Sequence, residues 1–212
     1  MLSFMVLRGR CRSCHRRISW QYPLVELATA GLFVLAISLS MTFGWAVYAA
    51  FVAAVCVVVF VIDLREHVIL DQVMLPALVV AVVANVVLQR PALDWLGGAI
   101  LGAGFFFFQY IVSRGRWVGG GDVRLGMFLG LVLGLVGTAV ALFLAYIGGA
   151  LFAIVLLLTH RKHFGSALPF GTFLTLATIV AWYWGTPIVS WYERGGLLNA
   201  LGLNALIDRL IS

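Results

Sequence analysis

Long apolar stretches, separated by short polar segments, run through almost the whole chain. A membrane-spanning helix needs about 20 consecutive apolar residues. The pattern predicts seven such segments, at 22–42, 45–63, 72–89, 93–112, 122–136, 138–159 and 168–190. The fifth is short and is separated from the sixth only around Gly134 and Gly137, so six spans are the alternative. We therefore predict an all-α fold, a polytopic helical bundle embedded in a membrane.

The two ends of the chain depart from this pattern. Residues 1–20 form a basic arm, and residues 193–212 place Leu and Ile at helical intervals with Asp208 and Arg209 among them. The second pattern predicts an amphipathic helix that lies in the membrane interface. No repeat or linker divides the remainder, so residues 21–192 are expected to form a single membrane domain.

The composition supports a protein of the lipid bilayer and excludes a nucleic-acid-binding one. Of the 212 residues, 63% are hydrophobic and only 10% are charged, whereas soluble domains carry about 25% charged residues. The net charge of +6 arises from basic residues in short loops between apolar segments, which is the pattern of membrane topology. Glycines recur at helical spacing within 97–104 and 126–134, and such glycines permit close packing of helices.

The distribution of Lys and Arg predicts the orientation of the chain. With seven spans, 11 of the 14 basic residues lie on the side of the N-terminal arm, and Arg90, Arg194 and Arg209 lie on the other side. Loops rich in Lys and Arg stay in the cytoplasm. We therefore expect the N-terminus in the cytoplasm and the C-terminus outside.

Two of the eight carboxylates stand at the ends of predicted spans. Asp63 ends the second span and Asp122 begins the fifth, so both are expected at the cytoplasmic membrane boundary. A carboxylate this close to hydrocarbon is costly without a partner or a function. Taken singly, each is an interfacial helix-end residue, and Asp122 would be a helix N-cap. Asp94, Glu193 and Asp208 are expected on solvated surface, and Glu66 in a local ion pair with Arg65.

Taken together, the two aspartates suggest a different interpretation. Two acids at the same depth on different helices can converge, and a close pair does not easily ionise twice, so one acid keeps a proton. An aspartyl protease needs this arrangement, because one acid deprotonates water and the other protonates the scissile carbonyl. Gly119, Gly120 and Gly121 would let a substrate backbone approach Asp122, because glycine has no Cβ.

Four segments, in this order along the chain, resemble the type IV prepilin peptidases, which are GxGD-type intramembrane aspartyl proteases. They are QYPLVELATAGLF at 21–33, ID at 62–63 followed by Asp71 and Pro76, GGGD at 119–122, and LPFG at 168–171. The resemblance implies that Asp63 and Asp122 are the catalytic pair. It also implies substrates, namely prepilins or pseudopilins, whose short basic leader is cut after a glycine at the cytoplasmic face of the bacterial inner membrane.

The resemblance also bears on cofactors. Members of the family usually begin with a further helix and a segment carrying two CxxC pairs, whereas this sequence shows one, CRSC at 11–14. A structural zinc ion needs four ligands. Cys11 and Cys14 supply two, and His15 is too close in sequence to be a third, so we favour an unpaired remnant over a zinc site. The family's methylation from S-adenosylmethionine is tied to the preceding segment, so we do not expect it here, and proteolysis needs no cofactor.

Two further acids could support the site. Asp71 begins the third span, where it either caps the helix, the interpretation we prefer, or holds a catalytic partner in place. Glu26 lies about one turn inside the first span. It could pair with Arg16 or Arg17, or line the path of the substrate, and we favour the structural role.

Two other classes of function fit an acid-bearing membrane protein. An ion- or proton-coupled transporter would place its acids near the middle of the bilayer, often in two similar halves. Here the acids lie at one face and the sequence shows no inverted repeat. A non-catalytic subunit of pilus or secretion assembly would keep the fold alone, and the retention of both aspartates argues against it.

Overall fold

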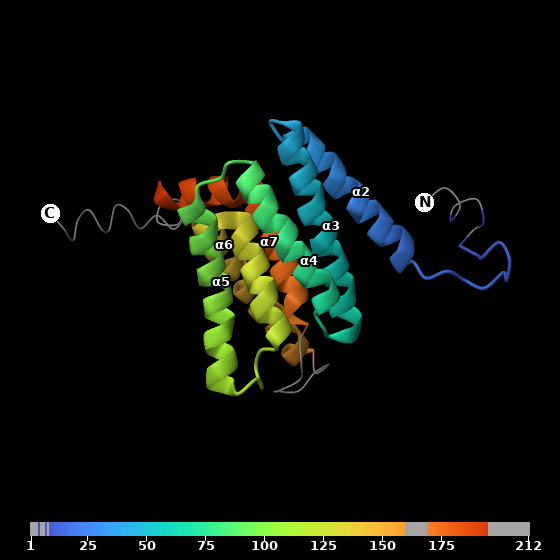
Figure 1. Cartoon of the computed structure of the whole chain (residues 1–212). Helices are drawn as coiled ribbons and strands as arrows, with labels where there is room; N and C mark the ends of the chain where they lie inside the picture. Colours follow the sequence, from blue (N-terminus) through green and yellow to red (C-terminus); the bar gives the residue numbers. More distant parts are fainter. Residues whose placement is uncertain (1–3, 5–6, 8, 160–168, 195–212) are drawn as a thin grey trace.

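The computed structural model describes residues 4, 7, 9–159 and 169–194 (Figure 1). Almost all of these residues are helical. The helices are α2 (Gln21–Leu39), α3 (Phe43–Glu66), α4 (Asp71–Val87), α5 (Ala92–Ser113), α6 (Gly120–Leu158) and α7 (Phe170–Glu193). Within the described ranges the only β-type pairing is an isolated bridge between Arg10 and Arg17. The predicted all-α fold is therefore confirmed.

All seven predicted apolar segments are helical, and the fifth and sixth are the two parts of α6. This helix contains a break at Gly134, whose φ of 74° and ψ of −174° are not helical. Five of the helices, α6 among them, are long and apolar enough to cross a membrane, and α4 is apolar but shorter, at 17 residues. From Gly120 to the break, α6 is about 21 Å long at 1.5 Å per residue, so the predicted fifth span is indeed short.

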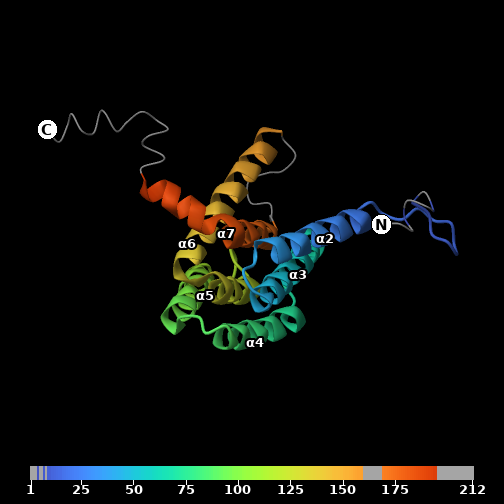
Figure 2. The same ribbon diagram turned by 90° about the horizontal axis from the view of Figure 1, so that it is seen from above.

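The chain reverses its direction at Gly134. Gly134 lies against Asp94, near the beginning of α5. Twelve residues later, Tyr146 lies near the end of α5, where its hydroxyl is 3.0 Å from Gln109 Oε1. The second part of α6 therefore runs back along the direction of α5, and it leaves the bundle at an angle (Figure 2). This reversal agrees with seven spans rather than six.

Polar side chains form hydrogen bonds with the free backbone groups where α6 breaks. Asp94 Oδ1 accepts a hydrogen bond from the Leu135 N–H at 3.0 Å, and Arg90 Nη1 donates to the Val132 carbonyl at 2.6 Å. Arg90 and Asp94 also form an ion pair, with 3.3 Å between Nη2 and Oδ2. Unpaired backbone groups are very costly in lipid, so these contacts stabilise the reversal. The Asp94 side chain is 42% exposed, as predicted for a surface residue, but it lies in the first turn of α5 and has a structural role that was not predicted.

A seam of glycines joins α5 to the first part of α6. A Cβ added to Gly98 would lie 2.5 Å from the Gly130 carbonyl oxygen, and one added to Gly126 would lie 2.5 Å from the Gly102 carbonyl oxygen. No side chain fits in so small a space. The close helix packing expected from the glycine spacing is therefore present.

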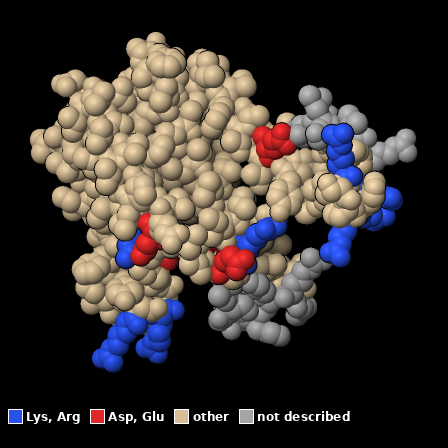
Figure 3. Space-filling model, turned by 45° about the vertical axis from the view of Figure 1, so that its right-hand side comes forward, with Lys and Arg blue, Asp and Glu red and all other residues tan. Residues whose placement is uncertain are grey.

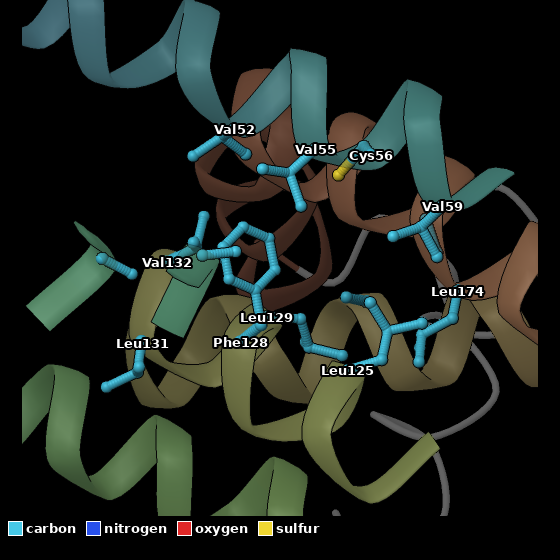
Figure 4. Close-up of a cluster of buried hydrophobic side chains, with 14 of the residues drawn as sticks. Val52, Val55, Cys56, Val59, Leu125, Phe128, Leu129, Leu131, Val132 and Leu174 are labelled. Atoms are coloured by element: carbon cyan, nitrogen blue, oxygen red, sulfur yellow. The ribbon is translucent and has the colours of Figure 1, made fainter. Parts of the chain in front are cut away.

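The hydrophobic core draws on α3 to α7, and Figure 4 shows the part of it between α3, the first part of α6 and α7. Valines of α3 point toward Leu125 and Phe128 of α6 in this view, with Leu174 of α7 beside them. All of these side chains are buried. Val59 lies about one turn before Asp63, and Leu125 lies about one turn after Asp122. The core therefore sets the separation of the two helices that carry the aspartates.

Charged residues avoid the body of the bundle. On the face in Figure 3 they gather at the lower edge of an uncharged body and on the N-terminal part of the chain. Large apolar side chains are exposed on every helix, as expected for a surface in contact with lipid. The predicted interfacial helix at 193–212 lies outside the described residues from 195 onward. The orientation of the termini stays a prediction.

Candidate active site

Asp63 lies at the end of α3 and is anchored by α7. Its side chain is buried, with 5% of the residue exposed, and Oδ2 accepts a hydrogen bond of 2.7 Å from the Thr172 N–H. Thr172 lies in the first turn of α7, where backbone N–H groups have no partner within the helix. Asp63 therefore completes the N-terminus of another helix, whose positive end attracts its negative charge.

Gly171 makes this contact possible. A Cβ at position 171 would lie 2.9 Å from Cγ and 2.9 Å from Oδ2 of Asp63, which is closer than carbon and oxygen atoms normally approach. Gly171 ends the LPFG segment, which was noted in the sequence for its resemblance alone. The structure gives the segment a physical role, because only glycine leaves room for the carboxylate of Asp63.

Beyond Asp63 the chain turns tightly into α4. His67 ends α3 in the left-handed conformation, with φ 53° and ψ 35°. Its N–H donates to the Asp63 carbonyl at 3.0 Å, and its ring Nδ1 lies 3.1 Å from the same oxygen. Four residues later α4 begins at Asp71. The loop between α3 and α4 is therefore short and lies beside the site.

Asp122 is the third residue of α6, and its own helix holds it. The N-cap residue is Gly119, and Oδ2 of Asp122 accepts the Gly119 N–H at 2.9 Å. This contact is the acidic half of a capping box. The alternative prediction that Asp122 is itself the N-cap was wrong in position, although the residue does stabilise the start of its helix.

The three glycines before Asp122 have different surroundings. A Cβ on Gly121 would lie 2.8 Å from Cβ of Ile69, in the loop between α3 and α4. A Cβ on Gly120 would have no atom within 4 Å, and one on Gly119 would lie 3.6 Å from Oδ2 of Asp122. Gly121 therefore serves packing rather than substrate access. The open space that was expected for a substrate backbone is present at Gly120.

The structure brings the two aspartates to the same end of the bundle. Gly121, next to Asp122, packs against Ile69, six residues after Asp63, and the two aspartates are close enough for their charges to interact. Each carboxylate has Oδ2 held by a backbone N–H, and each Oδ1 accepts no hydrogen bond from another residue in the described part of the chain. Two interacting carboxylates, each with one free oxygen, can share a proton and bind a water molecule between them.

Asp71 contacts α6 rather than capping α4. Its carboxylate forms an ion pair with Arg124, two residues after Asp122. Leu70 is the N-cap residue of α4, and no side chain caps that helix. The preferred interpretation of Asp71 as a helix cap was therefore wrong, and the alternative, that it holds a catalytic partner in place, stays a prediction. The Asp71 and Arg124 side chains are 50% and 40% exposed, so the pair contributes at most about 1 kcal/mol.

The remaining predicted residues lie in α2 and in the segment before it. Glu26 is exposed on α2, whose first residue, Gln21, accepts a hydrogen bond of 2.9 Å from Arg65, two residues after Asp63. Cys11 and Cys14 lie in a turn before α2, which is closed by a 2.9 Å hydrogen bond from the Cys11 N–H to the Arg16 carbonyl. Backbone N–H groups of Cys14 and Ser13 lower the pKa of the Cys11 thiol. Across the described ranges, no three His, Cys, Asp or Glu side chains are grouped as metal ligands.

Comparison with known proteins identifies the family. Residues 50–154 match the type IV leader peptidase family, and residues 1–40 match the bacterial peptidase A24 N-terminal domain. The prepilin leader peptidase/N-methyltransferase of Aeromonas salmonicida is 35% identical over 202 residues, which cover 91% of this chain and 68% of that protein. The chain belongs to the type IV leader peptidase family. The resemblance of the four sequence segments is thus confirmed.

A relative from a second bacterium gives the same result. The prepilin leader peptidase/N-methyltransferase of Bacillus subtilis is 33% identical over 203 residues, covering 93% of this chain and 79% of the relative. No solved structure matches the chain. As a type IV leader peptidase the chain is a membrane hydrolase, and the region matched to the family includes Asp63, Asp122 and both parts of α6 up to residue 154.

Proposed function

We propose that Asp63 and Asp122 are the catalytic pair of this type IV leader peptidase, and that they remove the leader peptide from prepilins or pseudopilins. The observation that carries the assignment is that two carboxylates, from the end of α3 and the start of α6, lie at the same end of the bundle, where Gly121 packs against Ile69. The other acids of the described residues do not offer such a pair. Asp71 and Asp94 are each matched by an arginine.

The geometry supports acid–base hydrolysis of a peptide bond. The pair holds one proton, so one aspartate is ionised and accepts a proton from water. The hydroxide adds to the carbonyl carbon, and the protonated aspartate donates its proton to the carbonyl oxygen. As the tetrahedral intermediate collapses, the C–N bond breaks, and the amine nitrogen takes up the proton that the first aspartate received from water. A hydroxyl group of the intermediate returns a proton to the other aspartate, so the pair ends with one proton, as it began. In both aspartates Oδ1 is available for these proton transfers, because a backbone N–H group holds Oδ2 instead.

The position of the pair suits a substrate that is half in water and half in lipid. Both aspartates lie at helix ends, so water reaches them at the boundary of the bilayer, while an apolar substrate helix can remain among the lipid-facing helices. The placement of basic residues supports the cytoplasmic face of the bacterial inner membrane for this boundary. We propose that cleavage needs no metal or other cofactor, since two carboxylates and water suffice. The names of the relatives also include a methyltransferase activity, and we do not propose that activity for this chain.

The assignment is tested by leader removal from a prepilin in membranes that contain equal amounts of each variant. Asp63→Asn and Asp122→Asn keep size and polarity but cannot act as a base. The effects of substituting residues that act as one catalytic unit are not additive. Each single variant and the double variant should therefore lose processing to the same extent. Asp71→Asn and Glu66→Gln are matched controls, and they should retain substantial activity. Processing close to wild type in either single aspartate variant would refute the pair.

A further inference from the structure

Tyr146, in the second part of α6, lies beside the start of α7 and near Asp122. The hydroxyl donates a 3.0 Å hydrogen bond to Gln109 Oε1 of α5, and it is close enough to Asp122 for their charges to interact. Gln109 is a polar residue within the otherwise apolar stretch FFFFQYIV at 105–112. Tyr146 is 38% exposed, so a substrate can reach it.

Aromatic neighbours hold the Tyr146 ring against the site. Its centroid lies 4.9 Å from that of Phe170 and 5.5 Å from that of Phe105, which meets it edge to face. Phe170 directly precedes Gly171, the residue that contacts Asp63. The ring of Tyr146 is therefore fixed between α5 and the start of α7. These ring contacts set the position of the hydroxyl group.

We propose that Tyr146 is a further catalytic residue, which donates a hydrogen bond to the carbonyl oxygen of the scissile peptide bond. The inference rests on the proposed aspartate pair. When hydroxide adds to the carbonyl carbon, the π electrons of the C=O bond move to the oxygen, and a fixed donor stabilises that charge. The hydroxyl of Tyr146 turns from Gln109 to this oxygen when substrate binds. Gln109 is then a positioning residue.

Two backbone donors beside the pair are already engaged. The Thr172 and Gly119 N–H groups, which could otherwise bind a developing negative charge at a helix N-terminus, donate to the carboxylates themselves. The protonated aspartate gives one proton to the carbonyl oxygen, and the hydroxyl group of Tyr146 supplies a second donor to the same atom. An interfacial tyrosine without a catalytic role would only place its ring at the membrane boundary, and phenylalanine would replace it without loss of turnover.

The test compares Tyr146→Phe with Tyr192→Phe in steady-state cleavage of a prepilin. Both changes remove one hydroxyl group, but Tyr192 lies at the opposite end of α7, where it is exposed. Removal of one oxyanion donor lowers kcat about 10²-fold or more. For a partly exposed donor we expect a loss of roughly tenfold to hundredfold in kcat, with KM changed less than about twofold and with unaltered thermal stability. Tyr192→Phe should match wild type.

A double-variant cycle separates catalysis from packing. Gln109→Leu removes the acceptor and should lower kcat less than Tyr146→Phe does, and the two changes combined should be no worse than Tyr146→Phe alone. A kcat for Tyr146→Phe within about twofold of wild type would refute the role of Tyr146. Independent, additive losses would refute the role of Gln109. Activity that survives Asp63→Asn would instead refute the proposed aspartate pair, so the two failures are distinguishable.

Discussion

The contact between Gly171 and Asp63 allows the catalytic geometry to be disturbed by a single methyl group. In Gly171→Ala the new Cβ would lie 2.9 Å from Cγ of Asp63, whereas carbon atoms in favourable contact are about 3.5–4.0 Å apart. The carboxylate and α7 must therefore separate by roughly 0.6 Å or more. Asp63 is buried between packed helices and bonded to Thr172, so it has no easy direction in which to move.

The expected consequence is a loss of turnover rather than of folded protein. Catalytic groups need to be placed within about 0.5 Å, and a displacement of about 1 Å can cost 10²-fold in rate. We expect kcat to fall about tenfold or more, with KM little changed. Alanine is favoured over glycine inside a helix by about 0.5–1 kcal/mol, which partly offsets the strain and should maintain the amount of protein in the membrane.

The matched control for this experiment lies in the same helix. A Cβ on Gly185 would have its nearest neighbour, Ala181 Cβ, at 4.0 Å, so Gly185→Ala makes the same chemical change in open space. The assay is leader removal followed by gel shift over time at several substrate concentrations. Wild-type kcat in Gly171→Ala would show that the position of Asp63 against α7 is not important for catalysis, and it would refute this reasoning.

Three other predictions concern folding, metal dependence and topology. Gly126→Ala inserts a Cβ 2.5 Å from the Gly102 carbonyl oxygen, so the thermal stability of the purified protein should fall, and an unchanged melting temperature would contradict the glycine seam. Changing Cys11 and Cys14 together to Ser should leave cleavage largely intact, as should a chelator, and abolition of cleavage by either treatment would indicate a metal. A cysteine at Glu66 should be labelled from the cytoplasm and one at Glu193 from outside, whereas labelling of both from one side would exclude seven spans.

The helices could be predicted because a bilayer restricts what a spanning segment can be. Each span must be apolar over its length and must satisfy its own backbone, so hydropathy alone locates α2 to α7 to within a few residues. The break in α6 was also visible, because Gly134 interrupts a stretch too long for one span. Asp63 and Asp122 could be placed at one end of the bundle, because alternate spans run in opposite directions.

The contacts that hold the acids could not be predicted in the same way. Asp63 and Thr172 are 109 residues apart, and no local pattern relates the end of one helix to the beginning of another. The role of Asp94 in the reversal of α6 was missed, because the sequence does not show that a backbone N–H, that of Leu135, becomes free beside it. The partner of Asp71 is likewise remote, since Arg124 is 53 residues away.

Both aspartates are fixed by backbone N–H groups at the start of a helix, Asp63 by α7 and Asp122 by α6. This choice of partner matters for the chemistry. An arginine or lysine bound to either carboxylate would stabilise the ionised form of both, and the pair would not keep the proton that the reaction needs. A helix N-terminus carries only a partial positive charge. It therefore holds one oxygen of each carboxylate in place and leaves the pair free to share a proton.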